Sequence, residues 1–369
     1  MAISDLYDDL GPAKVIHVHE PSLELRGILV VDNVACGPAI GGLRMASDAG
    51  LEECFRLARA MTLKNSAAGL AHGGGKSVIA ADPTLPRERK EQLIRAFAHA
   101  LRHETDYVFG PDMGTDETCM AWVKDEIGRA AGLPTALGGI PLDELGATGF
   151  GLLHAAQVAT RYGDLRLAGA RVAVQGFGAV GRHAARFLAD QGTVLVAASD
   201  TGGTIVDPAG LDVAALGALK DAGRSVTEHT SGTRSGRDAI LDVPCDVWIP
   251  AARPDVITAD NAARLQTKLV LQGANVPCTR AAEEALHARG VLVVPDFIAN
   301  AGGVICAAME LHGATRDAAF AAIAEKITAN TEAVLASAQR NRLLPRDAAT
   351  QLATRRVRDA MATRRFHVF

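Results

Sequence analysis

Apolar and polar residues alternate in two early stretches of the chain, and this pattern predicts strands at residues 15–19 and 25–31. Apolar residues then recur at helical spacing in residues 51–61 and 87–103, which predicts two amphipathic helices. The glycine-rich residues 36–44 lie between these strands and helices and are expected to form a loop. Such a loop can hold a carboxylate through its backbone N–H groups.

The second half of the chain has a different pattern, in which continuous apolar runs alternate with helical stretches. This indicates a parallel sheet that is covered by helices on both faces. The apolar runs lie at residues 171–175, 193–200, 246–250, 268–272 and 290–294. From about residue 316 onward, an alanine-rich helical pattern is long enough to return to the first half.

We therefore predict an α/β fold with two domains that are separated by a cleft. The boundary is placed at the Gly-Gly-Ile-Pro break at residues 138–141. The first domain is expected to span residues 1–138, with residues 328–369 packing back on it, and the second domain residues 139–327.

The composition narrows the class of protein. A net charge of −4 offers no electrostatic basis for binding nucleic acid or an anionic membrane. The acidic N-terminus does not have the pattern of a signal peptide, and no apolar run reaches membrane-spanning length. The six cysteines are scattered and form no Cys-x-x-Cys pair, so they indicate reduced thiols, not disulfides or zinc ligands. We therefore expect a cytoplasmic protein without a metal.

Two lysines, Lys64 and Lys76, lie in an otherwise nearly uncharged segment, and three glycines directly precede Lys76. The glycines are expected to form a flexible or tightly turned loop that delivers Lys76 into a partly dry pocket, where its amine pKa falls. The alternative is a solvated loop with a phosphate-binding lysine. Asp112 follows an apolar strand, where it could act in catalysis, although a turn-forming role is the commoner one.

A dinucleotide-binding pattern lies at the start of the second domain. A hydrophobic strand, a Gly-x-Gly-x-x-Gly sequence and a helix follow one another, and a second strand ends in an acid. These features predict NAD(P) binding, while the alternative is a nucleotide fold without a cofactor. The expected cofactor contacts are Gly176, Phe177, Gly178, Ala179, Val180, Gly181 and Asp200. NAD is expected over NADP, because Asp200 would repel a 2′-phosphate and Thr201-Gly202-Gly203 supply no cation.

Together these motifs resemble the glutamate/leucine/phenylalanine/valine dehydrogenase superfamily, from about Gly37 to Leu311. The resemblance implies a homo-oligomeric enzyme that converts an L-amino acid, NAD⁺ and water into a 2-oxo acid, ammonium and NADH. It assigns catalysis to Lys76, which activates the water, and to Asp112, which shuttles a proton. By the same resemblance, Lys64 with Gly41 and Gly42 binds the substrate α-carboxylate. Further cofactor contacts are implied for Thr148, Ala251, Asn275 and Asn300.

The substrate side-chain pocket is implied to contain Ile40, Gly110, Val304 and Ala307. Glutamate-specific members carry a lysine where this chain has Ile40 and a serine where it has Ala307. An unpaired distal carboxylate would be costly there, so we expect an apolar branched-chain or aromatic amino acid and a position closest to the leucine/phenylalanine branch. Two alternatives stay open. The first is a glutamate dehydrogenase, because residues 110–117 and 137–149 resemble those of the glutamate-specific members. The second is a catalytically silent nucleotide-binding paralogue.

Overall fold

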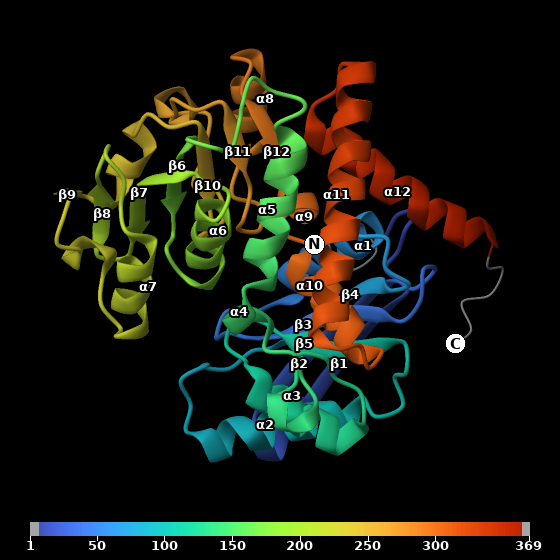
Figure 1. Ribbon diagram of the computed structural model, residues 1–369. Helices are drawn as coiled ribbons and strands as arrows, with labels where there is room; N and C mark the ends of the chain where they lie inside the picture. Colours follow the sequence, from blue (N-terminus) through green and yellow to red (C-terminus); the bar gives the residue numbers. More distant parts are fainter. Residues whose placement is uncertain (1–6, 364–369) are drawn as a thin grey trace. The chain divides into compact units, whose positions relative to one another are not determined.

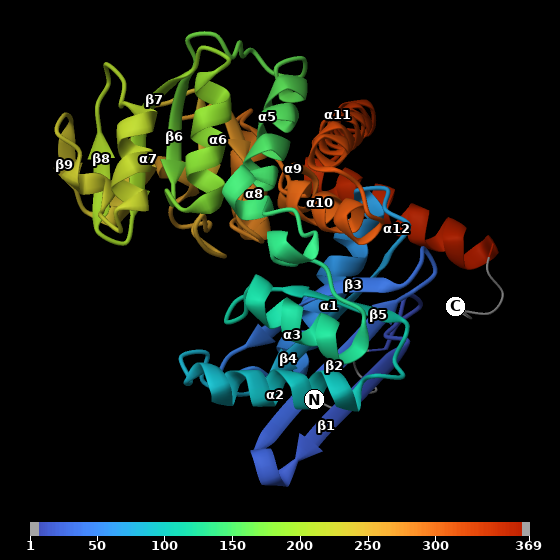
Figure 2. The same ribbon diagram turned by 60° about the horizontal axis from the view of Figure 1, so that its bottom comes forward.

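The computed structural model describes residues 7–363, which form two compact units (Figures 1 and 2). Unit 1 contains the described residues 7–141, 304–319 and 350–363. Unit 2 contains residues 142–303 and 320–349. Each unit has its own sheet with helices packed on it, so the predicted α/β fold with a Rossmann-type unit is confirmed.

Unit 1 is built on a five-stranded sheet with the order β1-β2-β4-β3-β5. The strands are β1 Lys14–Glu20, β2 Leu25–Asn33, β3 Ala39–Met45, β4 Gly73–Ile79 and β5 Tyr107–Pro111. Strands β1, β2 and β4 pair antiparallel, while β3 runs parallel to both β4 and β5. Because β3 lies between β4 and β5, side chains from all three strands can meet at one end of the sheet.

Helices cover both faces of this sheet. They are α1 Leu51–Ala67, α2 Arg87–Ala100 and α3 Glu117–Ile127. Cys54 and Ala58 of α1 pack against Val30 and Val78 on one face. On the other face, α2 and α3 close a larger core that includes Phe97. The two helices lie side by side below the sheet in Figure 1.

Two stretches that were predicted as glycine-rich loops are central strands. Residues 36–44 largely belong to β3, and the three glycines before Lys76 begin β4. A Cβ atom on Gly74 would lie only 1.9 Å from the backbone nitrogen of Thr62 in α1. The glycines therefore allow close packing of backbone on backbone, and the prediction that they provide flexibility or a turn is wrong.

Unit 2 is built on a seven-stranded sheet with the order β12-β11-β10-β6-β7-β8-β9. Its strands are β6 Arg171–Gln175, β7 Val194–Asp200, β8 Gly203–Val206, β9 Thr233–Ser235, β10 Val247–Pro250, β11 Leu269–Leu271 and β12 Leu292–Val294. Five strands pair parallel, as predicted, and β8 and β9 extend the sheet antiparallel. The chain passes from β6 to β7 on one side and returns to β10 on the other, which creates a switch point beside β6.

The helices of unit 2 are α4 Leu142–Leu145, α5 Ala147–Ala159, α6 Ala179–Ala189, α7 Val213–Asp221, α8 Arg280–Ala288 and α9 Asp296–Ala299. Trp248 of β10 is the largest fully buried side chain of its core. Short 3-10 helices occur at Pro21–Leu23, Thr135–Leu137, Val226–Glu228, Arg237–Asp242 and Ala262–Arg264. None of the six cysteines, which all lie within residues 7–363, forms a disulfide.

Three helices complete the described chain, and each contributes residues to both units. They are α10 Gly302–Leu311, α11 Arg316–Asn341 and α12 Pro345–Thr363. The helical pattern predicted from about residue 316 onward corresponds to α11 and α12. None of the helices within residues 7–363 has the length and apolar character needed to cross a membrane.

Candidate active site

Lys76 is a buried lysine in the middle of the unit 1 sheet. Its side chain is 5% exposed, and its Nζ lies 2.9 Å from Asp112 Oδ2. Burial lowers the pKa of Lys76, and although the carboxylate of Asp112 works in the opposite direction, the pKa stays below its ordinary value. A lysine with a lowered pKa can be neutral and act as a base. The predicted lowering is therefore present, although a strand and not a flexible loop holds the lysine.

Asp112 directly follows β5 and keeps its charge in this site. Burial alone would raise its pKa, but Lys76 and Arg44 outweigh that effect and hold the pKa of Asp112 below its usual range. The backbone N–H of Asp112 donates to Thr115 Oγ1, and that hydroxyl donates to the carbonyl of Leu43 in β3. Asp112 therefore forms a turn, which is the commoner of the two roles considered for it, and its side chain also contacts Lys76.

Arg44 is a third charged group of the site that the sequence reasoning did not assign. It is the penultimate residue of β3, and its Nε donates to Asp112 Oδ2 at 2.7 Å. Its other end pairs with Glu53 of α1. The positive charge of Arg44 also lowers the pKa of Lys76. Arg44 thus fixes the carboxylate and favours the neutral form of the neighbouring lysine.

The two glycines expected to bind substrate are neighbours in β3 but face different atoms. A Cβ atom on Gly42 would be 2.6 Å from Asp112 Cβ and 3.1 Å from Lys76 Nζ. A Cβ atom on Gly41 would be 1.8 Å from the carbonyl oxygen of Gly75 in β4. Gly41 therefore permits strand pairing, whereas Gly42 leaves the space beside the lysine and the carboxylate without a side chain.

Lys64 lies in the last turn of α1, not in a loop as its segment was predicted to form. The next residue, Asn65, is fully buried and donates to the carbonyls of Ile40 and Gly73. These bonds fix the end of α1 against β3 and β4. Lys64 itself is half-buried.

The residues expected to contact the substrate side chain come from two strands and one helix of unit 1. Ile40 in β3 is 5% exposed, and a Cβ atom on Gly110 in β5 would meet only one atom within 4 Å, at 3.8 Å. Val304 and Ala307 are one helical turn apart on α10 and are half-buried. Gly110 therefore has room for a larger residue.

Unit 2 contains a cavity of about 620 Å³ at the carboxyl ends of β6 and β7. Gly176, Phe177 and Gly178 line it. Gly176 has a φ of +92°, which favours glycine, and a Cβ atom on Gly178 would meet no atom within 4 Å. Gly178 precedes the first residue of α6, so the backbone there is open toward an anion at the helix N-terminus. The remaining fingerprint residues, Ala179, Val180 and Gly181, form the first turn of α6.

Asp200 ends β7 and also lines this cavity, but its surroundings differ from the expectation. Lys220 of α7 contacts its Oδ2 at 2.7 Å. Ser225 Oγ and the backbone N–H groups of Gly202 and Val226 donate to the same carboxylate. Residues 201–203 carry no cation, as expected, but a lysine twenty positions further along the chain supplies one beside Asp200, which the sequence reasoning did not foresee. These partners outweigh burial and hold the pKa of Asp200 below its usual range.

The remaining cofactor candidates come from helix α5, from the end of helix α9 and from the segments that follow β10 and β11. Asn300 is 3% exposed, its Nδ2 donates to Asn275 Oδ1, and its Oδ1 has no hydrogen-bond partner among residues 7–363. Such a buried acceptor fits a ligand that brings a donor, as a nicotinamide carboxamide does. Ala251 follows β10 and lines the cavity. Thr148 of α5 lies beside Gly303, where a Cβ atom would be 3.1 Å from its Oγ1.

The comparisons with known proteins agree with this architecture. Residues 138–365 match the family described as Glutamate/Leucine/Phenylalanine/Valine dehydrogenase. Residues 12–129 match Glu/Leu/Phe/Val dehydrogenase, dimerisation domain. The glutamate dehydrogenase of Aeropyrum pernix is 37% identical over 357 residues, which cover 90% of this chain and 85% of that protein. The NADP(+)-dependent glutamate dehydrogenase of Pyrobaculum calidifontis is 38% identical over 334 residues, with 83% and 79% covered.

A solved structure also resembles this chain over nearly its whole length. The hetero-hexameric glutamate dehydrogenase of Thermus thermophilus in its Leu-bound form superposes with a TM-score of 0.83 at 29% identity, covering 97% of this chain and 91% of that chain. The names of these relatives support the glutamate alternative better than an apolar substrate, and they do not confirm the leucine/phenylalanine branch. The predicted superfamily itself is confirmed: the chain belongs to the Glutamate/Leucine/Phenylalanine/Valine dehydrogenase family.

Proposed function

We propose that the protein catalyses the reversible oxidative deamination of an L-amino acid to the 2-oxo acid and ammonium, with a nicotinamide dinucleotide as hydride acceptor. The observation that carries this proposal is the buried contact between Lys76 and Asp112, with Arg44 on the same carboxylate. A lysine with a lowered pKa beside a carboxylate supports this reaction, because the two groups can exchange protons with the water and with the substrate nitrogen.

The roles of the chain's residues follow from their chemistry. Lys64 supplies a positive charge for the substrate α-carboxylate, and Gly42 leaves room for the substrate beside the catalytic pair. Neutral Lys76 accepts a proton from the water that attacks the iminium carbon. Asp112 carries a proton to and from the substrate nitrogen. Arg44 keeps the carboxylate of Asp112 oriented and favours its ionised form, so that it can accept the next proton.

A bound nicotinamide would supply the acceptor for the hydride that leaves the substrate Cα. The unoccupied acceptor of Asn300 and the open backbone at Gly178 fit a dinucleotide. We propose that Thr148, Asn275 and Asn300 hold its nicotinamide end, with the Gly176–Gly181 turn and the start of α6 at its pyrophosphate.

Glutamate is the substrate that the relatives support best, since the Aeropyrum, Pyrobaculum and Thermus proteins are all named glutamate dehydrogenases. A second candidate, an apolar branched-chain or aromatic amino acid, is favoured by Ile40. This side chain is buried in β3, where glutamate-specific members of the family carry a lysine. A distal carboxylate placed against Ile40 would cost several kcal/mol unless another group paired with it.

A panel of L-amino acids separates these candidates, with kcat/KM measured from NADH absorbance. The panel needs glutamate, leucine, valine, phenylalanine and tryptophan. A best value with glutamate supports the relatives' activity and means that a group other than residue 40 binds the distal carboxylate. A best value with leucine or an aromatic supports the pocket argument. If no amino acid reduces the cofactor, the proposed function is wrong, as expected for a silent paralogue.

We propose NAD as the preferred cofactor, because the carboxylate of Asp200 lies where the ribose hydroxyls of a dinucleotide bind. Lys220 is expected to reduce the difference in kcat/KM between NAD and NADP, because its ammonium can attract a 2′-phosphate. Replacing Lys220 by methionine is therefore expected to lower kcat/KM for NADP about tenfold more than for NAD, the scale of one partly exposed ionic contact. The matched control is Lys268→Met, which removes an exposed lysine at the opposite end of the strands. If Lys220→Met changes kcat/KM equally for both cofactors, Lys220 does not attract the 2′-phosphate of NADP.

We also propose that the protein is a homo-oligomer. Residues 12–129 match a dimerisation domain, and the Thermus thermophilus structure is described as hetero-hexameric. Mass measurement in solution by sedimentation tests this, and a monomer at all concentrations would contradict it.

A further inference from the structure

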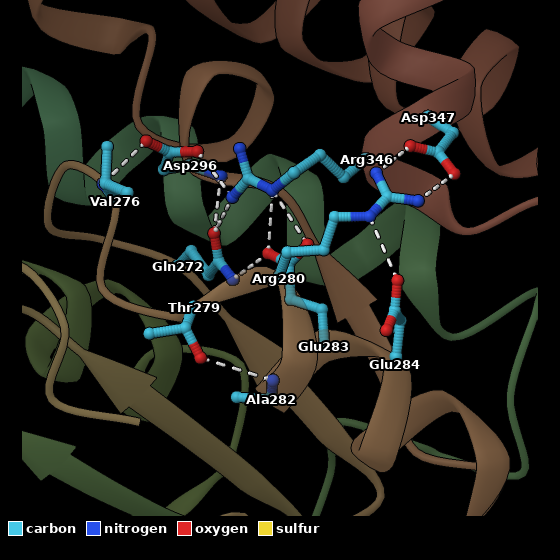
Figure 3. Close-up of polar contacts among 10 residues, drawn as sticks. All are labelled: Gln272, Val276, Thr279, Arg280, Ala282, Glu283, Glu284, Asp296, Arg346 and Asp347. Carbon is cyan, nitrogen blue, oxygen red and sulfur yellow. Dashed lines mark hydrogen bonds and ion pairs between the residues drawn. The ribbon is translucent and has the colours of Figure 1, made fainter. Parts of the chain in front are cut away.

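Arg346 is a largely buried arginine at an unusual position in a helix. It occupies the first turn of α12, where a positive charge is unfavourable because it opposes the helix dipole. Its side chain is only 19% exposed. Its Nε contacts Glu283 Oε2 at 2.7 Å, and its Nη2 contacts Asp296 Oδ1 at 2.9 Å. The same Nη2 donates to Gln272 Oε1 at 2.8 Å, so the guanidinium lies at the centre of a polar cluster (Figure 3).

The carboxylates around Arg346 are more buried than the arginine itself. The side chains of Glu283 and Asp296 are 4% and 7% exposed. Burial opposes the charged guanidinium, but these carboxylates outweigh it and raise the pKa of Arg346. Desolvating three charges offsets much of their attraction, so net stability is a weak reason for such a cluster. A role in holding a neighbouring segment in place is the better explanation for the cluster.

Asp296 connects the cluster to the loop that follows β11. While its Oδ1 binds Arg346, its Oδ2 accepts the backbone N–H of Val276 at 2.8 Å (Figure 3). Val276 has a φ of +47°, although valine is β-branched and rarely adopts the left-handed region. Its side chain is also exposed, so hydrophobic packing does not hold it there. A conformation of this kind persists only when its surroundings impose it.

The same loop carries a proposed cofactor residue. Asn275 directly precedes Val276, and Asn300 Nδ2 donates to the carbonyls of Gly273 and Ala274 and to Asn275 Oδ1. The backbone N–H of Asn300 in turn donates to the carbonyl of Asp296 at 2.7 Å. Asp296 therefore fixes Val276 through its side chain and Asn300 through its backbone.

We propose that Arg346 is a positioning residue for the cofactor: by orienting Asp296, it sets the strained 273–276 loop and Asn300 in the arrangement that receives the nicotinamide end of the dinucleotide. This inference rests on the proposed function, because it assigns the two asparagines to the cofactor. The proposed role of Arg346 involves no direct contact with the cofactor or the substrate.

The test uses Arg346→Met, which removes the charge and keeps much of the volume, and Arg346→Lys, which keeps the charge but cannot bind both carboxylates through one planar fork. NADH affinity is measured by fluorescence titration, together with kcat, KM for the amino acid and Tm. We expect Arg346→Met to weaken NADH binding about tenfold and to lower kcat, with little change in KM for the amino acid, and Arg346→Lys to recover part of the loss. Arg280→Met is the matched control, because its exposed pair with Asp347 lies beside the cluster but does not contact the loop (Figure 3).

A double-mutant cycle tests the route through Asp296. If Arg346 acts through this carboxylate, Arg346→Met adds little to the effect of Asp296→Ala on NADH affinity. A lower Tm with wild-type NADH affinity in both Arg346 variants would overturn the proposal and leave a structural role. Additive effects in the cycle would overturn the route through Asp296. If the wild-type protein itself binds no NADH, the proposed function fails, which separates that failure from failure of this inference.

Discussion

Replacing Lys76 by alanine is expected to lower kcat by at least about a hundredfold, the usual scale for losing a positioned acid–base group. The reason is that Lys76 supplies the buried amine, with a lowered pKa, that contacts Asp112. Because Lys76 is buried, Lys76→Met serves as a second variant that fills more of the space. NADH binding should be unchanged in both, since the cofactor candidates belong to unit 2.

The pH dependence gives an independent check on Lys76. The neutral amine is the active form, so kcat/KM should rise with pH through a pKa that lies below the ordinary lysine value. This limb should disappear from the residual activity of Lys76→Met. Lys124→Ala, which removes an exposed lysine of α3, is the control for the loss of a positive charge in unit 1. Near-normal turnover in Lys76→Met would refute the assignment of the base.

The Asp112→Asn variant is expected to lose turnover on a similar scale, at least about a hundredfold, because an amide cannot carry the proton to the substrate nitrogen. It should also change the pH profile of what remains. The Asp112 carboxylate raises the pKa of Lys76 against the effect of burial. Without it, the pKa of Lys76 falls further, and the rise of kcat/KM moves to lower pH.

Stability should follow pH differently in this variant. The pKa of Asp112 is lowered in the folded protein, so its contribution to stability is present above the unfolded-state pKa and is lost as pH falls through the folded-state pKa. Thermal unfolding of Asp112→Asn should therefore depend less on pH at the acidic end. Asp116→Asn, which removes a nearby carboxylate that caps α3, is the control. A profile in which Asp112→Asn moves the rise of kcat/KM to higher pH would contradict the coupling to Lys76.

The strands with side-chain patterns were predictable from the sequence, whereas the glycine strands were not. Alternation located β1 and β2, and apolar runs located the parallel strands of unit 2. Glycine has no side chain to report which face is buried, so β3 and the start of β4 carry no periodic signal. Glycine is needed there because neighbouring backbones lie too close for a side chain, as Gly41 does against Gly75. This closeness is seen in the structure and has no signal in the sequence.

The candidate site was predictable where a motif surrounds the residue. Lys76 follows its glycines and Asp112 ends its strand, and the structure brings them within 2.9 Å although 36 positions separate them. Arg44 and Lys220 were missed because each acts through a partner that is remote in sequence. Lys220 changes the reasoning on cofactor choice, and nothing in the residues around Asp200 signals that α7 returns to it.

The most direct test of the account is the stoichiometry of ammonium and NADH formed from a single L-amino acid by the wild-type protein. If Lys76 activates water and Asp112 serves the substrate nitrogen, one ammonium should appear for each NADH, and the rates of formation of both should fall together, by at least about a hundredfold, in Lys76→Met. NADH formed without ammonium, or no NADH with any L-amino acid and either NAD or NADP, would contradict the proposed function.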